Sequence, residues 1–164
     1  MYKRGKKGLM VFLRKKDDVC YQLASTQANV FERSTIQNIA SYFFIQEYMN
    51  SNDAKSLDDL SFLYGNSSEL EIYINTFNKT KRKYGGTVYP PEVMHWIGFF
   101  YRYAAYLTGM SSKKLFKTIP PTDLNKVYPL YHSLEISKAV STVFDDINYQ
   151  PTDRKAIFKK IYSY

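Results

Sequence analysis

Apolar residues recur every three or four positions through most of this chain, which is the pattern of helices that bury one face. The clearest stretch, 91–108, has this spacing at Val93, Trp96, Ile97, Phe100, Ala104 and Leu107. Pro91 suits a first helical position, and Gly109 suits the position just past the helix end. Tyr101, Tyr103 and Tyr106 widen the apolar surface almost all round, as in helices that are central in their domain. We therefore expect a core built around the 91–108 helix, with Trp96 inside it.

The same spacing, with polar residues at its edges, predicts further helices along the chain. Their expected caps are Ser34 (with a start as early as Thr26), residues 51–53, Ser68, Ser111 or Ser112, Thr122, Ser133 and Thr152. Ser68 followed by Glu71 is a capping-box pattern, and Pro129 is expected to kink or split its helix. Together these segments predict a mainly α fold, a single-domain multi-helix bundle that covers residues 25–164.

The first 24 residues are treated as a separate basic arm or hairpin. Two short apolar runs, 9–13 and 19–23, flank the polar residues 15–18. These runs can pair as a small N-terminal β-hairpin, although the connection lacks the Gly or Asn of a tight turn. They can equally form an extended arm that leads into the first helix.

Positive charge is concentrated in the same segment. Residues 1–16 hold seven basic side chains and no acid, whereas the rest of the chain holds 16 basic and 15 acidic ones. The seven are Lys3, Arg4, Lys6, Lys7, Arg14, Lys15 and Lys16. Such a segment is either a solvated tail or an arm that contacts the phosphates of a nucleic acid or an acidic partner. These seven residues are our candidates for nucleic-acid binding.

Composition narrows the class of protein. A single cysteine, Cys20, excludes an internal disulfide and a cysteine-based zinc cluster. No apolar run reaches the length of a membrane span, and the N-terminus lacks the apolar core of a secretory signal. We therefore expect a cytoplasmic protein that uses no metal or cofactor.

Arg102 is the best polar candidate, because it lies inside the most apolar helix and needs a partner there. We expect it to reach a carboxylate or carbonyls within the fold, or to anchor an anion or a partner protein. Polar residues fall in the turns after the central helix, and we predict that they converge with Arg102 on one partner- or anion-binding patch. They are Ser111, Ser112, Tyr128, Tyr131 and His132. Asp58 and Asp59 are interpreted as a solvated helix face.

These residues also form a recognisable pattern. It comprises Trp96-Ile97-Gly98, Tyr101-Arg102, Ser111-Ser112-Lys113, Tyr128 and Tyr131-His132, with Tyr48-Met49-Asn50-Ser51 and Leu57-Asp58-Asp59 upstream. The pattern resembles a family of short, poorly characterised bacterial proteins linked to toxin–antitoxin or mobile-element loci. The likeness covers residues 35–147 and leaves out the basic N-terminus and the end of the chain. It implies no established chemistry and carries over no catalytic residue.

The resemblance implies a non-enzymatic, antitoxin-like protein-binding module of a bacterial toxin–antitoxin or phage-conflict system, with a cognate protein such as a toxin as its partner. The basic N-terminus departs from an antitoxin whose acidic charge offsets a basic toxin, which keeps nucleic-acid binding open as an alternative. A toxin or enzyme with a polar site near Arg102 and His132 is the weaker alternative. The sequence supplies neither a nucleophile motif nor metal-ligand spacing.

Overall fold

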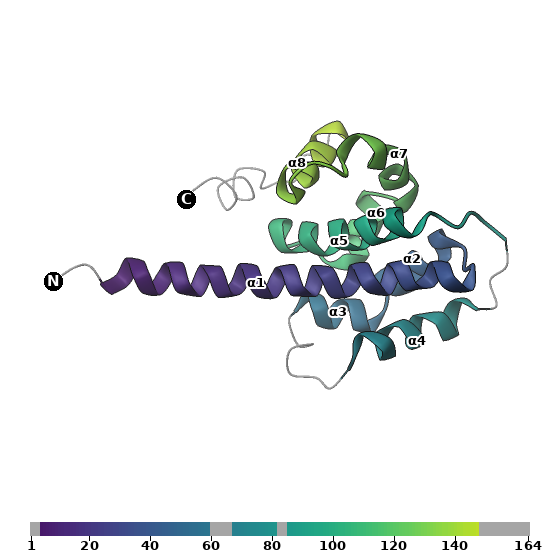
Figure 1. Cartoon of the computed structure of the whole chain (residues 1–164), viewed down its shortest axis with the longest axis horizontal. Helices are drawn as coiled ribbons and strands as arrows, with labels where there is room; N and C mark the ends of the chain where they lie inside the picture. Colours follow the sequence, from purple (N-terminus) through teal and green to yellow (C-terminus); the bar gives the residue numbers. More distant parts are fainter. Residues whose placement is uncertain (1–3, 60–66, 82–84, 148–164) are drawn as a thin grey trace.

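The computed structural model describes residues 4–59, 67–81 and 85–147, with side chains from residue 18 onward. These residues form a mainly helical bundle in which we found no strand (Figure 1). The helices are α1 (Arg4–Arg33), η1 (Ser34–Gln37), α2 (Ser41–Met49), α3 (Asn52–Asp58), α4 (Glu69–Thr80), α5 (Pro91–Thr108), α6 (Ser112–Thr118), α7 (Pro121–Tyr131) and α8 (Ile136–Asp146). The prediction of a mainly α fold is confirmed. The last predicted helix, after Thr152, lies outside the described residues.

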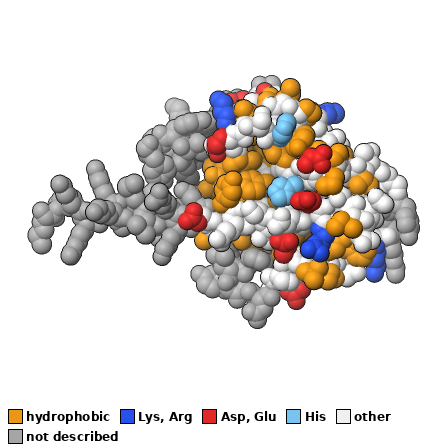
Figure 2. Space-filling model, viewed as in Figure 1, with side chains coloured by type: hydrophobic (Ala, Val, Ile, Leu, Met, Phe, Trp, Pro, Cys, Tyr) orange, Lys and Arg blue, Asp and Glu red, His pale blue; other side chains and the backbone are white. Residues whose placement is uncertain are grey.

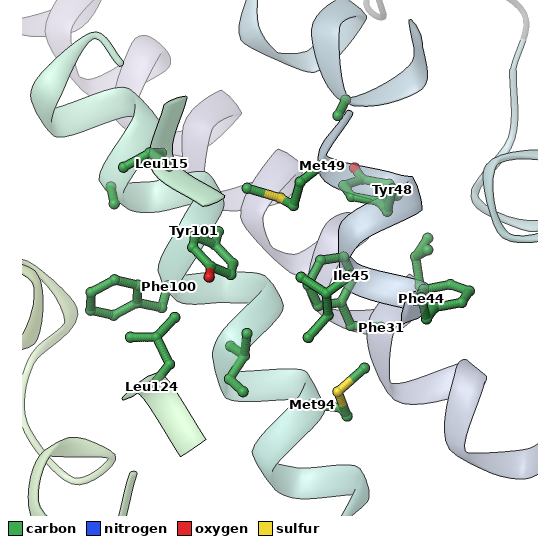
Figure 3. Packing of buried hydrophobic residues seen from close by; sticks show 14 of the residues in the cluster. Phe31, Phe44, Ile45, Tyr48, Met49, Met94, Phe100, Tyr101, Leu115 and Leu124 are labelled. Carbon is green, nitrogen blue, oxygen red and sulfur yellow. The ribbon is translucent and has the colours of Figure 1, made fainter. Parts of the chain in front are cut away.

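The central helix is α5, with the bounds that the sequence predicted. Pro91 is its first residue, and Gly109 ends it in the left-handed conformation, with φ of 70°. Buried residues occur on several sides of α5, including Val93, Ile97 and Tyr101. Figure 3 shows Phe100 and Tyr101 of α5 within the buried apolar cluster that the other helices complete.

Trp96 is not at the centre of this core, contrary to expectation. Its ring is only half-buried and packs on Phe100, at 5.2 Å between ring centroids, and on Tyr128, at 5.6 Å. The indole thus lies where α5 meets α7, at the margin of the core. Fully enclosed aromatic rings lie on α1 and α2 instead, where Phe31 packs edge-to-face against Phe44 and against Tyr48.

The main partner of α5 is α1, which the sequence did not indicate as a long helix. The two helices make the most extensive contact in the bundle and lie side by side (Figure 1). Gly98 permits this approach, because a Cβ atom there would lie 2.9 Å from the Ala28 Cα and 2.9 Å from the Gln27 carbonyl oxygen. The pair therefore packs backbone against backbone, and any side chain at position 98 would push the helices apart.

α1 also includes residues of the N-terminal segment 1–24, for which the sequence predicts an arm or hairpin. The boundary predicted between residues 24 and 25 falls inside this helix, and residues 19–23 of the proposed second strand are helical. Cys20, Leu23 and Ala24 are buried. Positions 20, 23, 24, 27 and 28 therefore form one inward-facing stripe with helical spacing.

Several of the predicted helix caps are present in the structure. Ser51 caps α3, Ser68 and Glu71 form the predicted capping box, and Ser111 caps α6. Ser34 is not a cap, since it is buried and its hydroxyl donates to the Phe31 carbonyl at the end of α1. Asn38, at φ of 51°, then separates η1 from α2, so the helix expected through residue 38 is two helices.

Two later boundaries differ from the prediction. α7 begins at Pro121 rather than after Thr122, and it runs through Pro129 without splitting. Pro129 lies two residues before the helix end and is exposed. Glu135, not Ser133, caps α8, because its carboxylate accepts from the N–H groups of Ser137 and Lys138. In the part of the chain that the structure describes, no helix combines the length and apolarity needed to cross a membrane.

Candidate functional site

Arg102 lies at the start of the fourth turn of α5 and is 4% exposed, with donors directed at three other helices. Its Nη1 donates to Asp58 Oδ1 at 2.6 Å, and its Nε donates to Gln27 Oε1 at 3.0 Å. Its Nη2 donates to Ser112 Oγ at 2.8 Å and to the Ala54 carbonyl at 3.3 Å. One guanidinium thereby joins α1, α3 and α6 to the central helix.

Asp58 is the counter-ion, and its position follows from the short helix that carries it. Ser51 fixes the start of α3, whose last residue is Asp58. The Asp58 carboxylate also accepts from the Ser112 backbone N–H at 2.9 Å and from the Ser112 hydroxyl at 2.7 Å. The side chain of Asp58 is 17% exposed. The prediction that it belongs to a solvated helix face is therefore wrong.

Gln27 and Tyr48 close the network on the other side. The Tyr48 hydroxyl donates to Gln27 Oε1 at 3.0 Å, and Gln27 Nε2 donates to the Gly98 carbonyl at 2.9 Å. Burial raises the pKa of Tyr48 well above that of an ordinary phenol, although the charge of Arg102 opposes the shift. No buried side-chain nitrogen or oxygen among the described residues lacks a hydrogen-bond partner. We name Gln27, Tyr48, Asp58, Arg102 and Ser112 the Arg102 network.

A cavity of about 460 Å³ adjoins the Arg102 network between α1, α3 and the end of α5. Asp58 and Arg102 form part of its wall. Its other lining residues are Cys20, Leu23, Lys55, Leu57, Asp59, Ala105, Tyr106, Gly109, Met110 and Ser111. Lys55, Asp59 and Ser111 are exposed and mark the rim, whereas Leu23, Leu57 and Met110 are buried and give an apolar floor.

The structure brings together half of the patch that the sequence predicted. Ser112 bonds directly to Arg102, and Ser111 lines the same cavity while it caps α6. The other three residues have their own partners at the α7 end of the bundle. Tyr131 donates to Asp146 Oδ2 at 2.5 Å, and the His132 Nδ1 lies 2.9 Å from the Tyr128 carbonyl oxygen. None of the hydrogen bonds that the structure gives these three residues reaches Arg102.

The two networks differ in exposure as well. The His132 ring stacks on Tyr128, with centroids 4.6 Å apart, and His132 is exposed. The hydrogen bond to Asp146 raises the pKa of Tyr131, because it is made by the protonated phenol. Arg102 and His132 thus share no described hydrogen-bond partner.

Sequence reasoning missed three members of the Arg102 network, namely Gln27, Tyr48 and Asp58, although Asp58 and Gln27 each left a signal. Asp58 is four positions after Ala54 and directly follows Leu57, so it borders the buried face of α3. Gln27 occupies a place in the 20–23–24–27–28 stripe of α1 that is otherwise apolar. A polar residue at a core position is expected to have a buried partner.

The structure describes only part of the candidate nucleic-acid-binding segment. Lys3 lies outside the described residues, and the others lie on the part of α1 for which the structure describes the backbone alone. They are Arg4, Lys6, Lys7, Arg14, Lys15 and Lys16. Among residues with described side chains, no three His, Cys, Asp or Glu side chains lie together as a metal ion would require.

Comparisons of the chain with protein-family models, with curated proteins and with solved structures gave no match.

Proposed function

We propose that this chain is a non-enzymatic protein-binding module and that its partner docks at the cavity beside the Arg102 network. The partner we propose is a cognate protein of a bacterial toxin–antitoxin or phage-conflict system, as the sequence resemblance implies. The observation that carries the proposal is the cavity itself, an apolar recess of about 460 Å³ with bonded, preorganised walls.

The chemistry of the wall favours an apolar guest. Arg102 and Asp58 are the charged groups best placed to orient a polar substrate, but they bond to each other and to Ser112. What remains for a guest is the apolar floor of Leu23, Leu57 and Met110. A large apolar side chain from a partner protein fits such a recess, as anchors at protein interfaces do.

The rim supports the same interpretation. Lys55 and Asp59 carry opposite charges on the exposed edge of the cavity, beside the hydroxyl-bearing Ser111. A mixed polar rim around an apolar centre is the usual anatomy of a protein interface. Rigid walls add affinity because little side-chain freedom is lost when the partner binds.

The test is co-expression of the chain with the product of each adjacent gene, followed by a binding measurement on any complex that forms. Ala105→Leu should fill the cavity, and Lys55→Glu should reverse a rim charge. Each is expected to weaken binding on the order of tenfold or more, while the melting temperature stays near that of the parent. Lys126→Glu is the control, because Lys126 lies on α7 with a side chain 77% exposed.

Two outcomes would count against the proposal. If a complex forms and neither cavity variant weakens it, the partner does not dock at this cavity. If no adjacent gene product binds at all, the assignment to a toxin–antitoxin or phage-conflict system is wrong.

A further inference from the structure

A second surface lies on the two longest helices and consists of aromatic rings. Tyr21 of α1 is 55% exposed and packs edge-on against Phe99 of α5, with centroids 4.8 Å apart. Phe99 stacks on Tyr103 at 6.1 Å with an interplanar angle of 13°, and Tyr21 meets Tyr103 at 6.3 Å. We name Tyr21, Phe99 and Tyr103 the aromatic row. Figure 2 shows hydrophobic side chains gathered on the face along α1 and α5.

The aromatic row is held firmly by the helices beneath it. Phe99 and Tyr103 are one helical turn apart on α5, directly beside Gly98, where α5 approaches the α1 backbone most closely. Both rings are partly exposed. Partly exposed rings on a rigid support are suited to stacking against flat groups, because little freedom is lost on binding.

The helix that carries Tyr21 continues into the basic segment. α1 extends beyond the other helices at its N-terminal end (Figure 1). Residues 4–16 of α1 include six basic residues and no acidic one, over about 18 Å of helix. Positions 14 and 7 precede position 21 by about two and four turns, in register with it on a straight helix. A cationic stretch therefore leads along one helix to the aromatic row.

Acidic residues between the basic segment and Tyr21 restrict the path that bound phosphates can take along α1. Asp17 and Asp18 separate the basic segment from Tyr21, and Asp18 lines a shallow depression with Tyr21, Gln22, Ser25 and Thr26. Phosphates would avoid this side of the helix and approach the aromatic row from the α5 side. Removal of the Asp18 charge should therefore strengthen the binding of a polyanion.

We propose that α1 and α5 together bind single-stranded nucleic acid, with phosphates along residues 4–16 and unpaired bases on the aromatic row. Cationic grooves combined with aromatic platforms are how proteins bind single strands with little sequence preference. A duplex hides its bases, so it would engage the charges alone. RNA and DNA share this chemistry, and both are compared in the test. The inference uses a surface separate from the cavity and does not rest on the proposed protein partner.

The experiment is fluorescence anisotropy of the full chain with labelled oligo-uridine, oligo-thymidine and a mixed-sequence duplex, each of about 20 units, a length that spans several base contacts. We expect tighter binding of the single strands than of the duplex, and a steep loss of affinity between about 50 and 200 mM salt. Tyr21→Ala and Tyr103→Ala should each weaken single-strand binding by about fivefold or more. Tyr42→Ala is the matched control, since Tyr42 is an aromatic residue 37% exposed on α2.

Charge variants complete the test. Joint replacement of Arg14, Lys15 and Lys16 by Ala should reduce the salt slope by about 2, because each phosphate that a single strand pairs with a basic side chain adds roughly 0.7 to that slope. The same change at the exposed Lys113, Lys114 and Lys117 of α6 should leave the slope unchanged. Asp18→Asn should raise affinity.

Three results would overturn the proposal. The first is no single-strand binding at about 50 mM salt. The second is equal affinity for single strands and duplex combined with unchanged binding by Tyr21→Ala. The third is competition by poly-glutamate as strong as that by oligo-uridine, which would identify an acidic protein as an equally good ligand for the charges.

Discussion

The Arg102 network and the α7 end of the bundle are both polar clusters beside aromatic rings. They differ in how far apart their hydrogen-bonded residues lie in the sequence and in how deeply they are buried. Arg102 bonds to residues 75, 44, 48 and 10 positions away, and it is almost fully buried. Tyr131 bonds to a residue 15 positions away, and His132 contacts a carbonyl only four positions away. The first cluster ties distant helices together, whereas the second joins neighbours on the surface.

This difference indicates what each cluster does for the molecule. A buried charge that loses its partner is costly, so the Arg102 network should help to fix how α1, α3, α5 and α6 meet. An exposed hydrogen bond competes with water and contributes little. We therefore expect changes in the Arg102 network to alter folding, and changes at Tyr131 or His132 to leave the fold almost unaffected.

The largest effect is expected from Arg102→Met. This change keeps a long side chain but leaves the Asp58 carboxylate without its counter-ion. The free energy of unfolding should fall by about 3–5 kcal/mol, towards the lower figure because Asp58 keeps some access to water. Urea denaturation would measure it. Lys126→Met is the control, since the Lys126–Asp123 pair is exposed and 4.0 Å apart, and it should change stability by less than about 1 kcal/mol.

A second variant tests the reason for that loss. Adding Asp58→Leu to Arg102→Met removes the uncompensated charge, so the double variant should be more stable than Arg102→Met alone. A double variant that is less stable by the sum of the two single losses would show that the charge pair is not the cause.

Next in size is Gly98→Ala, which probes the α1–α5 contact that supports the Arg102 network. At an exposed helical position this change usually gains up to about 1 kcal/mol through helix propensity. Here the new methyl group meets the Ala28 Cα and the Gln27 carbonyl at 2.9 Å, so a net loss of about 1–3 kcal/mol is expected. Thermal unfolding followed by circular dichroism would show whether Gly98→Ala raises or lowers the stability of the fold. A gain in stability would contradict the close approach of the two helices.

Trp96→Ala should have an intermediate effect, because the ring lies between the core and the α7 end. Full burial would make the loss about 3–5 kcal/mol, but the half-buried indole should cost only about 1–3 kcal/mol. Phe100→Ala, four residues on and fully buried, is the comparison, and it should cost more. Equal losses in urea denaturation would place Trp96 in the core after all.

The smallest effect is expected from Tyr131→Phe, which removes the hydrogen bond to Asp146. The pKa of Tyr131 is raised in the folded chain, so this bond stabilises the fold below the unfolded pKa of about 10. That contribution disappears as the pH rises through the folded pKa. Melting temperatures of parent and variant should thus differ slightly at neutral pH and converge in strong alkali. A melting-temperature difference that grows as the pH rises would contradict the raised pKa of Tyr131 in the folded chain.

The sequence by itself determined the features that depend on neighbouring residues. Pro91 and Gly109 bounded α5, and the Ser68–Glu71 pair marked the start of α4, because caps and stops act within one helical turn. Apolar spacing likewise predicted the mainly α fold. It did not indicate that residues 18–24 are helical, and it did not show that small and polar residues such as Ala24, Gln27 and Ala28 occupy core positions of that helix.

Only the tertiary structure decided which polar residues meet. Arg102 could be predicted to need a partner, but the choice of Asp58 and Gln27 depended on how α1 and α3 pack against α5. The same packing left Tyr128, Tyr131 and His132 with partners of their own, although they follow α5 closely in the chain. Sequence distance does not fix spatial distance once helices fold back on one another. The burial that gives Arg102 its structural role, and the cavity beside it, therefore exist only in the assembled bundle.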